Sequence, residues 1–146
     1  MKSENVKKRM HLLLVYPDFI EADAVKRSSG GSYSEGLASI SAVVKAGGHD
    51  VSLMHINHQF DEKEFKQKLK TYKDIDLIGF STRTTVFDYV KDLTKWTKEV
   101  YPSLITFAGS YHAILVPNVF MEVKGMDAVC VGEGEYPILE LMNKMA

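Results

Sequence analysis

The chain has 146 residues, of which 45% are hydrophobic and 25% are charged, a composition typical of one folded globular domain. Its 18 Lys and Arg nearly balance its 19 Asp and Glu, and the resulting net charge of -1 argues against nucleic-acid binding through a general positive field. The single Cys130 excludes an intramolecular disulfide and is typical of a reducing compartment, so we expect a cytoplasmic protein.

The first nine residues are rich in Lys and Arg and show no hydrophobic periodicity. We expect residues 1–9 to be a flexible lead-in and residues 10–146 to form the domain. The apolar run Met10–Tyr16 is too short to span a bilayer, and no cleavage site of a secretory signal follows it. The sequence therefore predicts no membrane span.

Short apolar runs and helical stripes alternate along the rest of the chain. In chain order, strands are predicted at 12–15, 50–56, 75–80, 104–108 and 127–131. Apolar residues spaced three or four apart predict helices between them: Leu37, Ile40 and Val44; Phe65, Leu69 and Tyr72; Val86, Val90, Leu93, Thr97 and Val100. Gly47-Gly48 and Pro102 mark two helix ends, and Pro117 and Pro137 lie near two further helix starts.

The strands predict the fold class. Of the four strands other than 50–56, three are almost continuously apolar, which is typical of strands buried on both faces in a parallel sheet covered by helices. Strand 50–56 alternates, with Val51, Leu53 and His55 on one face, and is expected at an edge. The sequence therefore predicts one α/β domain, a flavodoxin-like or Rossmann-like doubly wound sheet of five parallel strands.

Small hydroxyl residues and glycines gather in the loops that follow the strands. In an open parallel sheet these loops meet at the carboxyl ends of the strands, where ligands bind. Strands three to five are followed by Ser81-Thr-Arg-Thr-Thr85, Gly109-Ser-Tyr-His-Ala113 and Gly132-Glu-Gly-Glu135. One such loop alone is more often only structural. Three on one edge, with the long loop Pro17–Tyr33, predict a sizeable ligand with a polar or phosphorylated arm.

Several common sites are excluded. A P-loop needs a Lys after its second glycine, but Gly36 is followed by Leu37, and no dinucleotide fingerprint follows the first strand. Asp18 alone does not make a phospho-acceptor site, and no Gly-x-Ser-x-Gly elbow is present. We expect no metal site at His49, His55 and His58, and we interpret Cys130 as a small buried core residue within a strand. No catalytic residue is predicted.

Four segments together resemble a known family. They are Gly36–His49, Asp76–Thr82, Ala108–Ala113 and Val131–Glu135, and the resemblance covers nearly the whole chain. The chain resembles the N-terminal cobalamin-binding domain of cobalamin-dependent radical S-adenosylmethionine enzymes. The resemblance implies the strand order 2-1-3-4-5, cobalamin as cofactor, and a role as accessory module of a radical methyltransferase or cyclase.

The resemblance also implies what this chain lacks. The Cys-x-x-x-Cys-x-x-Cys motif of the radical domain is missing, so the iron–sulfur cluster and S-adenosylmethionine would belong to a partner domain, in cis or in trans. We expect the chain to be non-catalytic alone. Unlike the mutase-type domains, the stretch Pro17–Asp23 has no His for cobalt, which implies base-off cobalamin without a protein histidine ligand.

The resemblance assigns the cofactor contacts to the loops after the strands. One departure is Ser110, which stands where family members usually carry a second glycine and would narrow the space for the nucleotide tail. His112 is expected to position the tail or pack beneath the corrin. A flavin- or nucleotide-binding enzyme of the same fold and a ligand-free interaction domain stay as alternatives. The implied contacts are Pro17, Ser81, Thr82, Thr84, Gly109, Ser110, His112, Ala113, Gly132, Glu133, Gly134 and Glu135.

Overall fold

A computed structural model describes residues 8–19 and 32–146 of the chain. It contains a five-stranded sheet in the order β2-β1-β3-β4-β5, and every neighbouring pair of strands is parallel. The predicted fold class and strand order are therefore confirmed. The strands are β1 His11–Pro17, β2 Asp50–Ile56, β3 Leu77–Ser81, β4 Ile105–Gly109 and β5 Ala128–Val129.

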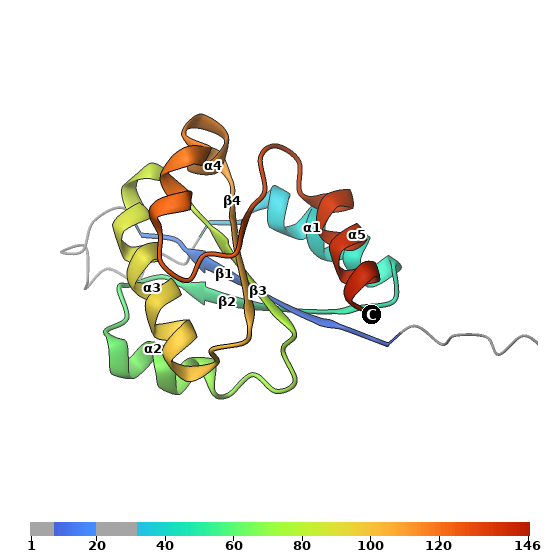
Figure 1. The fold of residues 1–146 in the computed structure, drawn as a ribbon, viewed down its shortest axis with the longest axis horizontal. Helices are drawn as coiled ribbons and strands as arrows, with labels where there is room; N and C mark the ends of the chain where they lie inside the picture. Colours follow the sequence, from blue (N-terminus) through green and yellow to red (C-terminus); the bar gives the residue numbers. More distant parts are fainter. Residues whose placement is uncertain (1–7, 20–31) are drawn as a thin grey trace, which may run out of the picture.

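Helices cover both faces of the sheet (Figure 1). Helices α1 (Glu35–Ala46) and α5 (Glu135–Met145) lie side by side on one face, and α2 (Glu62–Leu69) and α3 (Phe87–Val100) lie on the other. The short helix α4 (Tyr111–Leu115) follows β4 directly, and 3-10 turns span Thr84–Val86 and Pro117–Glu122. No helix in these described parts of the chain is long and apolar enough to cross a membrane.

Local sequence signals set the helix ends. The Ser34 side chain accepts a hydrogen bond from the Leu37 N–H and so caps α1, as Asp61 caps α2 through Glu64. After α1, Gly48 has a φ of 90°, the left-handed conformation that a glycine after a helix provides. The predicted helix ends at the Gly47-Gly48 pair and before Pro102 are thus confirmed.

The central strands have the predicted two-sided burial. Leu13 and Val15 of β1 pack in a core cluster with α2 and α3, whereas Leu12 and Leu14 pack in a second cluster with α1 and α5. Hydrophobic burial on both faces holds the three layers together. The second of these clusters supplies Leu14, Phe107 and Ile138 to the lining of the site described below.

The two edge strands compare differently with the predictions: β2 lies at an edge of the sheet as predicted, whereas β5 is shorter than predicted. Strand β5 has two residues, with Ala128 exposed and Val129 half-buried, because one side of the strand has no neighbour among the described strands. Cys130 follows β5 and is half-buried, so its placement in a buried strand was wrong. In β2, Met54 and Ile56 are the buried residues, and Leu53 on the opposite face is 50% exposed.

Only residues 8 and 9 of the predicted lead-in belong to the described part of the chain. Residues 1–7 lie outside the described residues. Lys8 and Arg9 form exposed ion pairs with Asp76 and Asp50, at 3.0 Å and 2.5 Å. Exposed pairs of this kind contribute at most about 1 kcal/mol each.

Candidate cofactor-binding site

A cavity of about 830 Å³ lies at the carboxyl ends of the strands, between the sheet and helices α1 and α5. Its floor follows from strand register, because Leu14 of β1, Gly79 of β3 and Phe107 of β4 are consecutive partners across the sheet. Residues two positions apart in a strand point to the same face. A second row therefore lies nearer the strand ends, formed by Tyr16, Ser81 and Gly109.

Gly79 shapes the floor through its missing side chain. A Cβ placed on Gly79 would lie 2.7 Å from Cε2 and 3.0 Å from Cε1 of the Phe107 ring. The ring can therefore lie over the central strand only because residue 79 is a glycine. The floor of the cavity is an aromatic ring between two aliphatic walls.

Helices α1 and α5 form these walls. Leu37 and Ile40 come from α1, and Ile138 comes from α5. Side chains from both helices lie close together at Gly134, because a Cβ at that position would be 3.0 Å from Cδ1 of both Ile40 and Ile138. The Ser39 side chain and the backbone N–H groups at the start of α5 lower the pKa of the Glu135 carboxyl.

Three glycines leave open space along the cavity. A Cβ on Gly36 or Gly132 would meet no atom within 4 Å, and one on Gly109 would only touch Cys130 at 3.8 Å. Gly132 also has a φ of 97°, which other residues rarely adopt. This part of the lining is backbone that a ligand can approach closely.

Ser110 lies between β4 and α4 in a backbone conformation that belongs to glycine. Its φ of 79° and ψ of -166° fall in a region that is essentially restricted to glycine, at a cost of about 1–3 kcal/mol. Hydrogen bonds on both sides hold it there: the Thr82 N–H donates to Gly109 O at 2.9 Å, and the His112 N–H donates to Thr82 O at 3.1 Å. Ser110, which stands where the resembled family usually carries a glycine, is therefore a strained residue on the cavity wall.

The twelve sequence-predicted contacts divide into two groups. Some line the cavity, and the others lie behind it in the protein interior or at its edge. The lining group is Ser81, Gly109, Ser110, Gly132, Glu133, Gly134 and Glu135, and the group outside the lining is Pro17, Thr82, Thr84, His112 and Ala113.

Thr82 and Ala113 lie outside because they are fully buried. The Thr82 hydroxyl donates to the Phe80 carbonyl at 3.3 Å, and Ala113 packs in a small core cluster with Phe120. Their small side chains allow close packing between α4 and the sheet.

His112 is 8% exposed and does not line the cavity. Its Nδ1 is 3.0 Å from the Thr84 hydroxyl, and its ring packs on Phe87 and Phe120 with centroid distances of 4.5 and 5.7 Å. Packing therefore accounts for this side chain in the structure, while its predicted contact with a cofactor stays a prediction.

The sequence interpretation missed a charged cluster after β1. The buried Asp18 carboxylate lies 3.0 Å from His55 Nε2 and 3.5 Å from Arg83 Nη2, and it accepts a hydrogen bond from the Ser32 N–H. Burial raises the pKa of Asp18, but the hydrogen bonds from Ser32 and His55 outweigh it and lower that pKa. Opposite charges directly after β1 and β3 were the available signal.

Arg83 connects this cluster to the cavity, which it lines. Its Nη2 donates to the Pro17 carbonyl at 3.2 Å, whereas its buried Nε has no hydrogen-bond partner among the residues that the structure describes. Pro17 thus contributes to the site through its carbonyl, behind Arg83. An unpartnered buried N–H is costly and is typical of a functional site.

The three histidines examined for metal binding have separate partners. His49 Nδ1 accepts a hydrogen bond from the Met10 N–H at 3.1 Å, and His58 lies 3.1 Å from Glu64. No group of three or more His, Cys, Asp or Glu within residues 8–19 and 32–146 is arranged to hold a metal ion.

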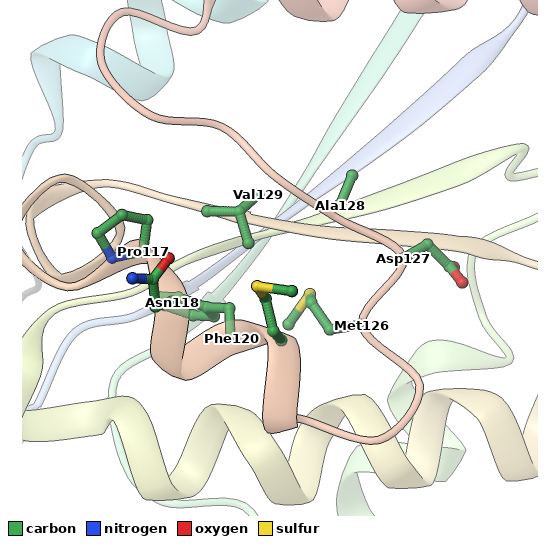
Figure 2. Close-up of a pocket in the computed structure, with 8 residues that line it drawn as sticks. Pro117, Asn118, Phe120, Met126, Asp127, Ala128 and Val129 are labelled. Carbon is green, nitrogen blue, oxygen red and sulfur yellow. The ribbon is translucent and has the colours of Figure 1, made fainter.

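A second, smaller cavity of about 300 Å³ lies at the β5 edge (Figure 2). Figure 2 shows Val129 pointing from β5 toward Phe120 and Met126, so apolar side chains line most of it. The Asp127 carboxylate there is already bound by Lys98 at 2.6 Å and by the Thr106 N–H at 2.9 Å. This cavity therefore offers packing and no chemistry.

Known proteins share both the sequence pattern and the fold. A curated relative, the anaerobic magnesium-protoporphyrin IX monomethyl ester cyclase of Rubrivivax gelatinosus, is 27% identical over 137 residues, which is 92% of this chain and 24% of the relative. The chain thus spans about a quarter of that protein.

Two solved structures share the fold. The cobalamin-dependent S-adenosylmethionine radical enzyme OxsB with aqua-cobalamin bound matches with a TM-score of 0.73 and 18% identity over 94% of this chain and 19% of OxsB. A cobalamin-binding protein from Desulfitobacterium hafniense DCB-2 matches with a TM-score of 0.68 and 17% identity over 96% of this chain and 60% of that protein.

The B12 binding domain family matches residues 24–142. That range contains α1, most of α5 and four of the five strands. Since the match covers most of the chain, the chain belongs to the B12-binding domain family.

Proposed function

We propose that this module holds cobalamin base-off, with the nucleotide tail in the cavity between α1, α5 and the sheet and the corrin over the carboxyl ends of the strands. The observation that carries the proposal is the cavity itself, which opens at the edge where ligands of parallel sheets bind. Its volume of about 830 Å³ lies in the range of pockets that bury a drug-sized group.

The residues present fit this cofactor. Backbone at Gly36, Gly109 and Gly132 leaves space that side chains would fill, and Arg83 brings a positive charge to the lining. A guanidinium there suits the phosphodiester of the tail. The apolar floor suits its aromatic base.

The histidines support a cobalt without a ligand from this chain. His112 packs between Phe87 and Phe120, and His55 pairs with Asp18. Neither side chain lines the cavity. A ring held in this way would have to break its present contacts to reach a cofactor above the strand ends.

We assign the module an accessory role in a radical S-adenosylmethionine methyltransferase or cyclase of the cytoplasm. The radical domain, in cis or in trans, would hold the iron–sulfur cluster and S-adenosylmethionine. Cobalamin supplies a cobalt centre for methyl or electron transfer when bound, and the protein contributes binding, orientation and electrostatics. The resemblance of the chain to a cyclase and to OxsB supports this assignment.

Desalting after incubation with hydroxocobalamin or FMN tests the proposal. We expect the visible spectrum of cobalamin to stay with the protein and the flavin to be lost. Retained flavin without corrin absorbance contradicts the proposal.

Two glycine variants locate the site. Gly132→Val and Gly48→Val both place a branched side chain at a positive φ, of 97° and 90°, and both Cβ atoms enter open space. Only Gly132 lines the cavity. We expect similar losses of stability by circular dichroism, but loss of cobalamin only in Gly132→Val. Full retention by a folded Gly132→Val would place the site elsewhere.

A further inference from the structure

We propose that the cavity selects among cobamides by their lower base, favouring benzimidazole bases over adenine. The inference rests on the proposed function, because it concerns the residues that would surround the nucleotide tail. It adds the class of ligand that the site prefers.

The inner part of the cavity is apolar. Leu14, Gly79 and Phe107 form its floor, and Ile40 and Ile138 form its walls. Backbone groups add no free partner at the floor, because β3 pairs with β1 on one side and with β4 on the other. A flat apolar base such as dimethylbenzimidazole matches this surface.

The polar lining residues lie at strand ends and helix starts, and several already have partners. Ser34 accepts the Leu37 N–H, the Tyr16 hydroxyl is hydrogen-bonded to the Ser32 hydroxyl, and the Cys130 thiol points toward the Glu133 carbonyl. Arg83 and Ser81 lie nearer the mouth, at the ends of the strand rows.

Adenine carries ring nitrogens and an amino group that benzimidazole lacks. In the inner part of this cavity those groups would lose water without gaining a partner from the described lining, which penalises binding. An apolar pocket rejects an isostere that adds one polar group by about 10²-fold, so we expect a discrimination of this modest size.

Affinity for two cobamides tests the proposal in the parent protein. The dissociation constants of cobalamin and of its adenine analogue are measured in the Co(I) state, in which neither base is bound to cobalt in solution. We expect the adenine cobamide to bind at least tenfold more weakly, which corresponds to about 1.4 kcal/mol. Equal affinities overturn the base preference and leave the proposed function intact, whereas failure of both cobamides to bind overturns both.

A matched pair of variants assigns the preference to the inner walls. Ile40→Asn places an amide beside the tail, and Leu115→Asn makes the same kind of change on α4, where Leu115 is 71% exposed. We expect Ile40→Asn to reduce the ratio of the two dissociation constants at least fivefold, and Leu115→Asn to change it less than twofold. An unchanged ratio in an Ile40→Asn protein that still binds cobalamin contradicts the assignment.

Discussion

Replacing Ser110 by glycine should stabilise the protein. The backbone at Ser110 has φ 79° and ψ -166°, and a side chain there costs about 1–3 kcal/mol. Glycine removes this strain but adds about 0.4–1 kcal/mol of unfolded-state entropy. We therefore expect Ser110→Gly to raise the free energy of unfolding by about 1–2 kcal/mol, and each kcal/mol raises the Tm of a chain this long by about 2–4 °C.

Urea unfolding of the cofactor-free protein measures this effect, with two variants as controls. Ser41→Gly makes the same substitution inside α1 and should destabilise by about 0.5 kcal/mol, because glycine is a poorer helix former than serine. Ser110→Ala keeps the side-chain strain and removes the hydroxyl, so it separates the backbone effect from any hydrogen bond.

The sign of the change in the free energy of unfolding tests whether the backbone at Ser110 is strained. If Ser110→Gly is no more stable than the parent, or if Ser110→Ala stabilises as much as Ser110→Gly, then backbone strain at Ser110 is not the cause. In either case the assignment of a strained cavity wall is wrong.

Three further predictions follow from the site. Gly79→Ala forces the buried Phe107 ring to move and should lower the free energy of unfolding by about 1–3 kcal/mol. In a Phe107→Leu background, calorimetry should show no such loss on adding Gly79→Ala. The electron paramagnetic resonance signal of bound Co(II) should lack nitrogen splitting and be unchanged in His112→Ala; a splitting lost in that variant would make His112 the ligand. The pKa of Asp18 is lowered from 3.8, so the Asp18 carboxylate stabilises the fold above that pH, and this contribution disappears as the pH falls through the folded pKa. The urea midpoints of the parent and of Asp18→Asn should therefore differ at neutral pH and converge in acid. The control Asp88→Asn changes a side chain that is 90% exposed and should match the parent at every pH.

The sequence was sufficient to predict the sheet because burial on both faces leaves a clear pattern. The apolar runs of β1, β3 and β4 and the period of α1 and α3 record which surfaces face the core. The last strand was predicted too long, since an edge strand with few neighbours needs no such pattern, and Val131 is 59% exposed despite its apolar side chain.

The site was predicted only at its mouth. Glycine and hydroxyl residues mark the loops after the strands, but the floor residues Leu14, Gly79 and Phe107 are indistinguishable from core until strand register places them in one row. Gly79 carried a usable signal, because a glycine inside an apolar strand indicates a close approach. The Asp18–Arg83 contact needed the spatial adjacency of β1 and β3.

The division between floor and mouth has a consequence for binding. The floor and walls belong to strands and helices whose positions are fixed by the core. A ligand that binds there therefore loses little binding free energy to ordering the protein. Strain and unpaired polarity lie at the mouth, in the Ser110 backbone and the Arg83 Nε. Stability is therefore reduced where a cofactor would contact the loops and kept where its tail would be buried. For this reason Ser110→Gly should stabilise the fold without changing the base preference that the inner walls impose.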